Sequence, residues 1–267
     1  MQDKLDEWFA EDFGKGDFTS QAVVNNKPCE ANVTGGPGVI SGLKVCLAFL
    51  ERHDIDYTDY NDGDTIDSPL IISLKGRAHD ILATERLLLN ILSHLSGIST
   101  HTNNIVKIAK EANPNVEILA TRKTLPGLRV LEKEAVVHGG GQTHRMRLDD
   151  AILIKDNHLK LSKSIEESIS LSRTKYPDLM LEVEADNEEQ ALEIAECGAD
   201  RVMLDNFTPL DAAKTIKKLR QFSNIEIEIS GGVTIENVAE YAKNTDFISL
   251  GSLTMSSLPV DFSLHVI

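Results

Sequence analysis

The second half of the chain repeats one pattern, in which a short apolar run is followed by a longer stretch with helical periodicity. Each of six such runs spans three to five residues, at 116–120, 151–154, 179–183, 202–204, 225–229 and 247–250. Apolar runs of this length between helical segments predict buried parallel strands joined by crossover helices. At this number and length, an α/β barrel, complete or open, fits the pattern best.

The ends of the intervening stretches support this prediction. Proline suits the first turn of a helix, glycine often follows the last turn, and threonine or aspartate caps the start. We therefore expect helices from Pro126 to Gly139 and from about Lys163 to Lys175. A third helix should begin at a capping box of Asp186 and Glu189 and end at Gly198, and two more should be capped by Thr208 and Thr234.

The first hundred residues show a mixed pattern. We expect helices at 3–10 and 42–50, strands at 30–34, 38–40 and 70–74, a turn at 61–64, and a loop at 11–20 with Asp17 and Thr19 as turn or cap residues. The strongest helix is expected at 79–102, where leucines form an apolar face and Arg86 belongs to a polar stripe. Periodicity alone would assign that stripe to solvent.

This change of pattern divides the chain into two domains. We expect a first domain at 1–103, a barrel domain at 104–253, and a C-terminal segment at 254–267 that returns to the first domain.

Charge and composition narrow the function. The 267 residues carry a formal net charge of −15, which argues against a nucleic-acid or anionic-membrane partner. Cys29, Cys46 and Cys197 are too few and too scattered for a disulfide framework or a zinc site. The acidic N-terminus lacks the basic start of a signal peptide, and no apolar run approaches the roughly 20 residues of a membrane span. We expect a cytoplasmic protein.

Basic residues nevertheless concentrate between residues 121 and 158. They are Arg122, Lys123, Arg129, Lys133, Arg145, Arg147 and Lys155. A basic cluster in an acidic protein usually serves an anionic ligand, because it focuses the electric field against the surrounding sign. For Arg129, Lys133 and Arg147, pairing with acidic neighbours at the surface is at least as good an explanation.

The residues that directly follow the predicted strands sort by chemistry. Basic groups follow the early strands, acidic groups the middle ones and glycines the last ones: Thr121, Arg122, Lys123, Lys155, Asp156, Glu184, Asp205, Ser230, Gly231, Gly232 and Gly251. In an α/β barrel these positions share the face where active sites lie. Arginine suits carboxylates, lysine suits phosphates, paired carboxylates suit Mg²⁺, and glycines let backbone N–H groups approach phosphate. The glycines at 139–141 fit such a role or a helix end equally well.

Eight segments between residues 11 and 252 resemble the quinolinate phosphoribosyltransferase family, also called carboxylating nicotinate-nucleotide pyrophosphorylase. They are EDFGKGDFTS, GVISG, ERLLLNILSHLSGIST, TRKTLPGLRVLEKEAVVHGGGQTHR, IKDNH, LEVEAD, VMLDN and EISGG. The resemblance implies an N-terminal α/β sandwich domain, an open α/β barrel of the type II phosphoribosyltransferase kind, and a dimer with shared active sites. Further assembly into a hexamer is left open. The wording GQTHR departs from the family's more frequent asparagine-containing form, but the pair His144-Arg145 is intact.

The resemblance also implies a role for each matching residue. The quinolinate-binding set is similar to Arg122, His144, Arg145 and Lys155, with Arg86 supplied by the neighbouring subunit. The set for 5-phosphoribosyl diphosphate is similar to Lys123, His158, Glu184, Asp205, Ser230, Gly231, Gly232 and Gly251. Catalysis would fall to Lys123, Lys155, Glu184 and Asp205, and Mg²⁺ to Glu184 and Asp205, partly through water and substrate.

The implied enzyme is a pentosyltransferase that forms nicotinate mononucleotide, diphosphate and carbon dioxide. Two related alternatives are a sister group associated with molybdate-transport operons and a nicotinate-using phosphoribosyltransferase. An alternative of a different class is a barrel lyase or aldolase with Lys155 as a Schiff base. The wording KDNH at 155–158 argues against the sister group, and the many cations argue for a dicarboxylate. A Schiff-base lyase would leave the acidic pair and the glycines without a purpose. A non-catalytic acidic scaffold would leave the sorted strand ends unexplained.

Overall fold

The computed structural model describes residues 2–51, 60–222 and 224–267. The chain forms two compact units, one of Met1–Asn103, Glu134–Gly140 and Ser257–Ile267, and one of Asn104–Lys133 and Gly141–Ser256. Residues 1 and 52–59 of the expected first domain lie outside the described part. Within the described residues, no helix is both long and apolar enough to cross a membrane.

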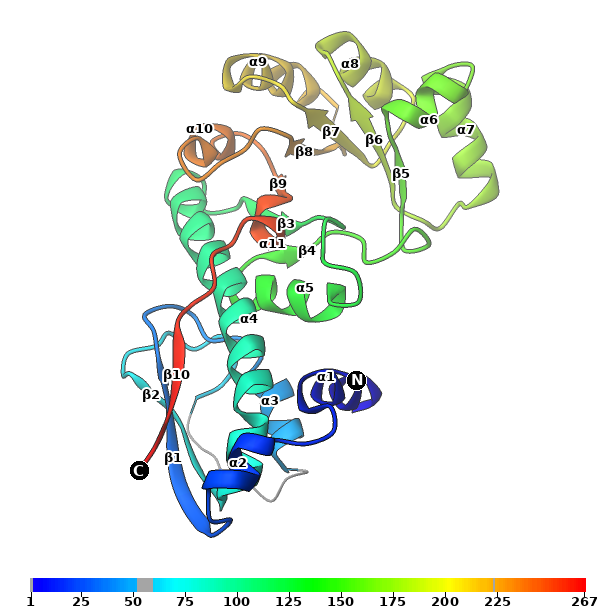
Figure 1. Ribbon diagram of the computed structural model, residues 1–267. Coiled ribbons are helices and arrows are strands. Elements are labelled where there is room, and N and C mark those ends of the chain that lie inside the picture. The colour runs from blue at the N-terminus through cyan, green and yellow to red at the C-terminus, as the bar shows by residue number, and fades with distance from the viewer. Residues whose placement is uncertain (1, 52–59, 223) are drawn as a thin grey trace. The chain divides into compact units, whose positions relative to one another are not determined.

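The first unit is built on a small antiparallel sheet with the strand order β10-β1-β2 (Figure 1). Its strands are β1 (Pro28–Gly35), β2 (Leu70–Arg77) and β10 (Phe262–Val266), and its helices are α1 (Gln2–Phe13), α2 (Phe18–Val23), α3 (Leu43–Leu50) and the first part of α4 (Ala78–Ala112). Buried side chains from these strands and from α3 and α4 form one core that includes Val33, Ile72, Leu43, Leu88 and Leu92. The C-terminal strand thus belongs to the same sheet as β1, with which it pairs.

Most elements expected in the first unit are present, with shifted boundaries. The loop expected at 11–20 is short, because α1 runs to Phe13 and α2 begins at Phe18. Asp17 caps α2 by accepting a hydrogen bond from the Ser20 N–H at 2.9 Å, whereas Thr19 lies inside the helix. The strand expected at 38–40 is a single bridge between Val39 and Thr65.

The second unit contains a seven-stranded sheet in which every neighbouring pair is parallel, with the order β4-β3-β9-β8-β7-β6-β5. Its strands are β3 (Glu117–Ala120), β4 (Gln142–Thr143), β5 (Ile152–Ile154), β6 (Leu181–Ala185), β7 (Arg201–Asp205), β8 (Glu226–Ser230) and β9 (Phe247–Leu250). Strands β4 and β5 form the two edges, and neither is paired beyond its one neighbour in the described part of the chain. The sheet is therefore the open α/β barrel that the sequence predicts.

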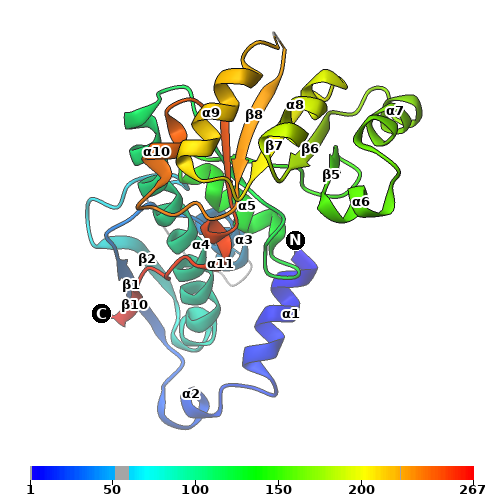
Figure 2. The same cartoon turned by 90° about the horizontal axis from the view of Figure 1, so that it is seen from above.

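Helices follow most of these strands, as crossover connections require. They are α5 (Arg129–His138), α6 (Asp156–Leu161), α7 (Ile165–Lys175), α8 (Glu188–Glu196), α9 (Pro209–Leu219), α10 (Val238–Ala242) and α11 (Ser252–Met255). Figure 2 shows α8 and α9 beside the strands β6, β7 and β8 that they connect.

Several helix starts differ from the expectation because local hydrogen bonds select a nearby residue. The cap of α8 is Asn187, whose side chain accepts from the Gln190 N–H, so the expected capping box is displaced by one residue. Turns precede α5 and α10, which start three and four residues after the expected Pro126 and Thr234. Helix α6 was not anticipated, and its start is tied by a hydrogen bond from the Lys155 N–H to His158 Nδ1 at 2.9 Å.

Candidate active site

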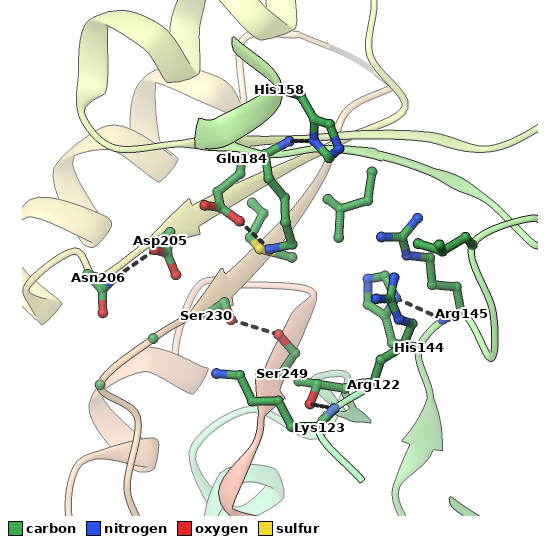
Figure 3. Close-up of a pocket in the computed structure, with 17 residues that line it drawn as sticks. Arg122, Lys123, His144, Arg145, His158, Glu184, Asp205, Asn206, Ser230 and Ser249 are labelled. Atoms are coloured by element: carbon green, nitrogen blue, oxygen red, sulfur yellow. Dashed lines mark hydrogen bonds and ion pairs between the residues drawn. The ribbon is translucent and has the colours of Figure 1, made fainter. Parts of the chain in front are cut away.

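A cavity of about 670 Å³ opens at the carboxyl ends of the parallel strands (Figure 3). Its lining is Thr121, Arg122, Lys123, His144, Arg145, Leu148, Leu153, Lys155, His158, Glu184, Met203, Asp205, Asn206, Ser230, Gly231, Gly232 and Ser249. Eleven of the thirteen sequence-predicted site residues are in this lining. The exceptions are Arg86, which lies on α4 in the first unit, and Gly251, which lies against Lys123.

One side of the cavity is basic. Figure 3 shows Arg122, His144 and Arg145 grouped there, while the side chain of Lys123 extends from the segment beside Arg122 toward Ser230. Lys123 follows β3, and its backbone is held by the Thr254 hydroxyl, which donates to the Lys123 carbonyl at 2.5 Å. The close approach of Lys123 explains Gly251, where an added Cβ would lie 2.6 Å from Lys123 Cδ. An anion that enters this side meets the guanidinium groups of Arg122 and Arg145.

The opposite side is acidic and carries the ends of β6 and β7. Both strands extend further than expected, so Glu184 and Asp205 lie inside them and project into the cavity. Lys155 Nζ forms an ion pair with Glu184 Oε2 at 2.5 Å, and Asn206 donates to Asp205 Oδ2 at 2.6 Å. Burial, helped by the charge of Glu184, raises the pKa of Asp205. A cation placed between these carboxylates would relieve that repulsion.

The oxygens of this side fit a divalent cation. Glu184, Asp186 and Asp205 each offer one carboxylate oxygen, and these oxygens all lie within 4.8 Å of one another. An all-oxygen donor set is the kind that Mg²⁺ prefers. Asp186 is exposed and was not among the residues that the sequence singled out as metal ligands.

A tight turn after β8 completes the lining. Gly231 and Gly232 have φ of 76° and 64°, in the left-handed region that favours glycine. A Cβ on Gly231 would lie 2.3 Å from Asn206 Oδ1, whereas a Cβ on Gly232 would meet open space. Because α10 starts only at Val238, any anion here would be held by this turn and the Ser230 side chain, not by the start of a helix.

A buried lysine that was expected to be as well explained by surface pairing holds the backbone of the His144-Arg145 segment. Lys133 is buried, and its Nζ donates to the carbonyls of His144 and Arg145 at 2.7 and 2.8 Å. Burial lowers the pKa of Lys133 to about 8. Arg129 also supports this region by donating to the Met146 carbonyl, whereas Arg147 is the exposed, ion-paired residue that the surface explanation describes.

Beneath His144 lies a buried acidic pair that the sequence analysis missed. His144 Nε2 lies 2.7 Å from Glu182 Oε2 and 3.5 Å from Glu228 Oε2. Burial raises the pKa of both carboxyls to about 7, and the same effect lowers the pKa of His144. Arg201 contacts Glu228 Oε2 at 3.1 Å and is also paired with Glu226. Their sequence signal is the alternation in LEVEA and EIEIS, which puts every second residue on one face.

Comparisons with known proteins cover almost the whole chain. The family model described as "Quinolinate phosphoribosyl transferase, N-terminal domain" matches residues 17–96, and that of the C-terminal domain matches residues 98–265. A protein of Archaeoglobus fulgidus named "Probable nicotinate-nucleotide pyrophosphorylase [carboxylating]" is 41% identical over 94% of this chain and 98% of its own. The rat protein named "Nicotinate-nucleotide pyrophosphorylase [carboxylating]" is 34% identical over 97% of this chain and 88% of its own.

Solved structures of proteins with the same names share the fold of this chain. The nicotinate-nucleotide pyrophosphorylase from Francisella tularensis superposes with a TM-score of 0.93 at 32% identity, over 98% of this chain and 94% of that one. Human nicotinic acid phosphoribosyltransferase, at 13% identity and a TM-score of 0.65 over 98% of this chain and 72% of that one, shares only the fold. The two family models, the full-length relatives and the cavity at the strand ends lead to one assignment: the chain belongs to the quinolinate phosphoribosyltransferase family.

Proposed function

We propose that this protein transfers the phosphoribosyl group of 5-phosphoribosyl diphosphate to quinolinate, giving nicotinate mononucleotide, diphosphate and carbon dioxide. The step belongs to NAD biosynthesis. The observation that carries the proposal is one cavity with cations on one side and carboxylates and a glycine turn on the other, in a chain of this family. Such a cavity suits two polyanionic substrates that repel each other until the protein holds them together.

The basic side suits quinolinate. Arg122 and Arg145 each offer a planar fork for a carboxylate, and Lys155, which is paired with Glu184 on the acidic side, adds a point charge from across the cavity. His144 belongs to the same group of side chains. The dicarboxylate needs more positive charge than nicotinate would, which favours quinolinate over the monocarboxylate.

The other side suits 5-phosphoribosyl diphosphate. Ser230, Gly231 and Gly232 form a turn around which backbone N–H groups can reach the 5′-phosphate, and Gly251 adjoins Lys123. Lys123 and His158 would contact the diphosphate, and Glu184 and Asp205 would face the ribose hydroxyls.

We also propose that Glu184 and Asp205 hold Mg²⁺, partly through water and substrate. The support is their oxygen donor set and the raised pKa of Asp205, which a neighbouring cation would lower again. When bound, the ion would neutralise charge on the leaving diphosphate.

The chemistry then needs little from the protein beyond placement and charge. The pyridine nitrogen attacks the anomeric carbon while the bond from that carbon to the diphosphate oxygen breaks. Glu184 and Asp205 stabilise the positive charge that develops on the ribose. When the carboxylate next to the ring nitrogen departs as carbon dioxide, the electron pair stays on the ring carbon, where the positive charge of the nitrogen stabilises it. A proton from water then binds that carbon. Catalysis thus falls to Lys123, Lys155, Glu184 and Asp205.

The shared active site of a homodimer belongs to the same proposal. Arg86 is well exposed, and its guanidinium lies a long 3.9 Å from the Glu85 carboxylate. Its guanidinium is thus available to a neighbouring subunit, where it would contact quinolinate. A cytoplasmic location is also proposed and agrees with the free thiols of Cys29, Cys46 and Cys197.

The alternatives have less support. Relatives at 31–41% identity over nearly the full chain are named carboxylating nicotinate-nucleotide pyrophosphorylases, which argues against the molybdate-associated sister group. Lys155 forms an ion pair with Glu184, whereas a Schiff-base lysine needs a free, neutral amine.

The test is an assay with quinolinate, 5-phosphoribosyl diphosphate and Mg²⁺ that follows nicotinate mononucleotide and carbon dioxide, with nicotinate in parallel. We expect product from quinolinate only, and its loss in Arg122→Ala. Product from nicotinate would overturn the substrate assignment, and no product from either substrate with folded protein would overturn the activity.

A further inference from the structure

Both ring nitrogens of His144 are already used inside the protein. The Arg145 backbone N–H donates to His144 Nδ1 at 2.8 Å, a contact drawn as a dashed line in Figure 3. A backbone N–H can only donate, so Nδ1 is an acceptor and carries no proton. A neutral imidazole must then carry its proton on Nε2, which points at Glu182 Oε2 at 2.7 Å.

The partners of this ring are fixed more firmly than those of a surface histidine. The side chains of Glu182 and Glu228 are 1% and 0% exposed, and that of His144 is 8% exposed. Glu228 is held in turn by Arg201, whose guanidinium lies 3.9 Å from the centre of the Phe247 ring. The successive contacts from His144 through Glu228 and Arg201 to Phe247 therefore leave the imidazole little freedom to rotate.

Each of the two carboxyls also has one buried oxygen whose burial costs stability. The second oxygens, Glu182 Oε1 and Glu228 Oε1, are buried and have no hydrogen-bond partner among the described residues. A buried polar atom without a partner destabilises a fold, and such groups persist where they serve a site. The ion pairs that the two carboxylates form run to His144 and Arg201, and Glu228 also has hydrogen-bonding neighbours in Glu182 and Ser249.

We propose that Glu182 and Glu228 are positioning residues that fix His144 as its Nε2–H tautomer, so that His144 offers quinolinate the carbon surface of its ring and not a nitrogen. This inference rests on the proposed function of the cavity, which His144 lines. Recognition of the two carboxylates is then left to Arg122, Arg145 and Lys155. His144 sets the shape of the pyridine site and holds the Arg145 backbone N–H, so that the Arg145 side chain starts from a fixed point.

The first test needs no variant of the acidic pair and no turnover. In ¹⁵N-histidine-labelled protein, NMR reports which nitrogen of each imidazole carries the proton, and His144→Gln assigns the signal among the eight histidines. We expect His144 to be protonated at Nε2 and unprotonated at Nδ1, both alone and with quinolinate. A proton on Nδ1 in the quinolinate complex would overturn the inference. An Nε2 without a proton would overturn it as well, and that is the state that a metal ion bound by His144, Glu182 and Glu228 would require.

The second test compares matched variants. Glu182→Leu and Glu228→Leu remove the oxygens that face His144 Nε2, while Glu226→Gln removes the other carboxylate of Arg201 and leaves His144 untouched. We expect each of the first two to raise the KM for quinolinate about tenfold, the equivalent of one hydrogen bond, with the KM for 5-phosphoribosyl diphosphate unchanged. Glu226→Gln should change neither constant.

The outcomes separate this inference from the proposed function. If the unaltered protein does not turn over quinolinate, the proposed function fails, while the NMR tautomer of the free protein still stands or falls by itself. If it does turn over quinolinate, equal changes in both KM values, or no change in Glu182→Leu, would overturn the positioning role.

Discussion

At the scale of single residues, the buried pair Glu182 and Glu228 links the site to the stability of the protein. Burial raises the folded-state pKa of each to about 7, above the ordinary 4.5. The folded protein therefore binds more protons than the unfolded chain between these values. Stability from this source is fully present below about pH 4.5 and is lost as the pH rises through about 7.

This linkage predicts how Glu228→Gln responds to pH. Between pH 4.5 and 7, the wild type should lose stability relative to the variant, by on the order of 3 kcal/mol for one carboxyl. Urea denaturation at several pH values would measure the difference. Glu226→Gln, which alters a half-exposed carboxyl on the same strand, is the control. A difference between wild type and Glu228→Gln that does not vary with pH would contradict the argument.

The position of individual charged residues, in the cavity or at the surface, was the hardest feature to predict from the sequence. Residue type and position after a strand were enough to find Arg122, Lys155 and Glu184, because the ends of parallel strands meet at one face. Lys133 could not be found in this way, since its function depends on the carbonyls of a loop eleven and twelve residues later. Its neighbours in the sequence resemble those of any surface lysine.

At the scale of elements, the turn after β8 shows how two adjacent glycines differ. Both have left-handed backbones, but only Gly231 also lies close to other side chains, because an added Cβ would be 2.3 Å from Asn206 Oδ1 and 2.8 Å from Asp205 Oδ1. We expect Gly231→Ala to raise the KM for 5-phosphoribosyl diphosphate more than Gly232→Ala does, because it combines backbone strain of about 1–2 kcal/mol with displacement of Asn206. Steady-state kinetics would measure both. Equal effects of the two substitutions would show that the contact with Asn206 does not matter.

The order and type of the barrel strands could be predicted, but their last residues could not. Apolar runs marked the interior of β6 and β7, and both strands continue through the polar residues Glu184 and Asp205. Hydrogen bonds to neighbouring strands, such as the registers Glu184 with Met203 and Asp205 with Ser230, keep these residues extended. Such pairing is a property of the sheet, which a single run of sequence does not contain.

The same strands carry a signal that alternation could have revealed. Residues two apart in a strand point to the same side, so a glutamate at position 184 implies that Glu182 shares its face. The same reasoning connects Ser230 to Glu228. Alternating glutamates in a buried strand therefore predict a charged layer beneath an active site.

At the scale of the whole molecule, the proposed shared site can be tested by mixing two inactive variants. Arg86→Ala would damage the group supplied to the neighbour, and Arg122→Ala a group supplied to the protein's own cavity. After the subunits are mixed and exchanged, half of the dimers should contain both variants, and each of these should have one intact site. About a quarter of wild-type activity should return.

One control makes this test decisive. A mixture of Arg122→Ala with Lys123→Ala should stay inactive, because both changes affect the same cavity. If the mixture with Arg86→Ala also stays inactive, although the subunits have exchanged, then Arg86 does not act across a dimer.

The gap in the barrel has a mechanical consequence. Residues 144–151 run from edge strand β4 to edge strand β5, so the seam between the two edges is crossed by covalent chain and not by a backbone ladder. A closed barrel can widen only by breaking hydrogen bonds between strands, whereas this sheet can widen at its seam without breaking any. An anion bound by both Arg145, on the crossing segment, and Arg122, after β3, would link the crossing segment to the sheet. Binding of the substrate would thus fix the distance between the two edge strands, and with it the diameter of the barrel.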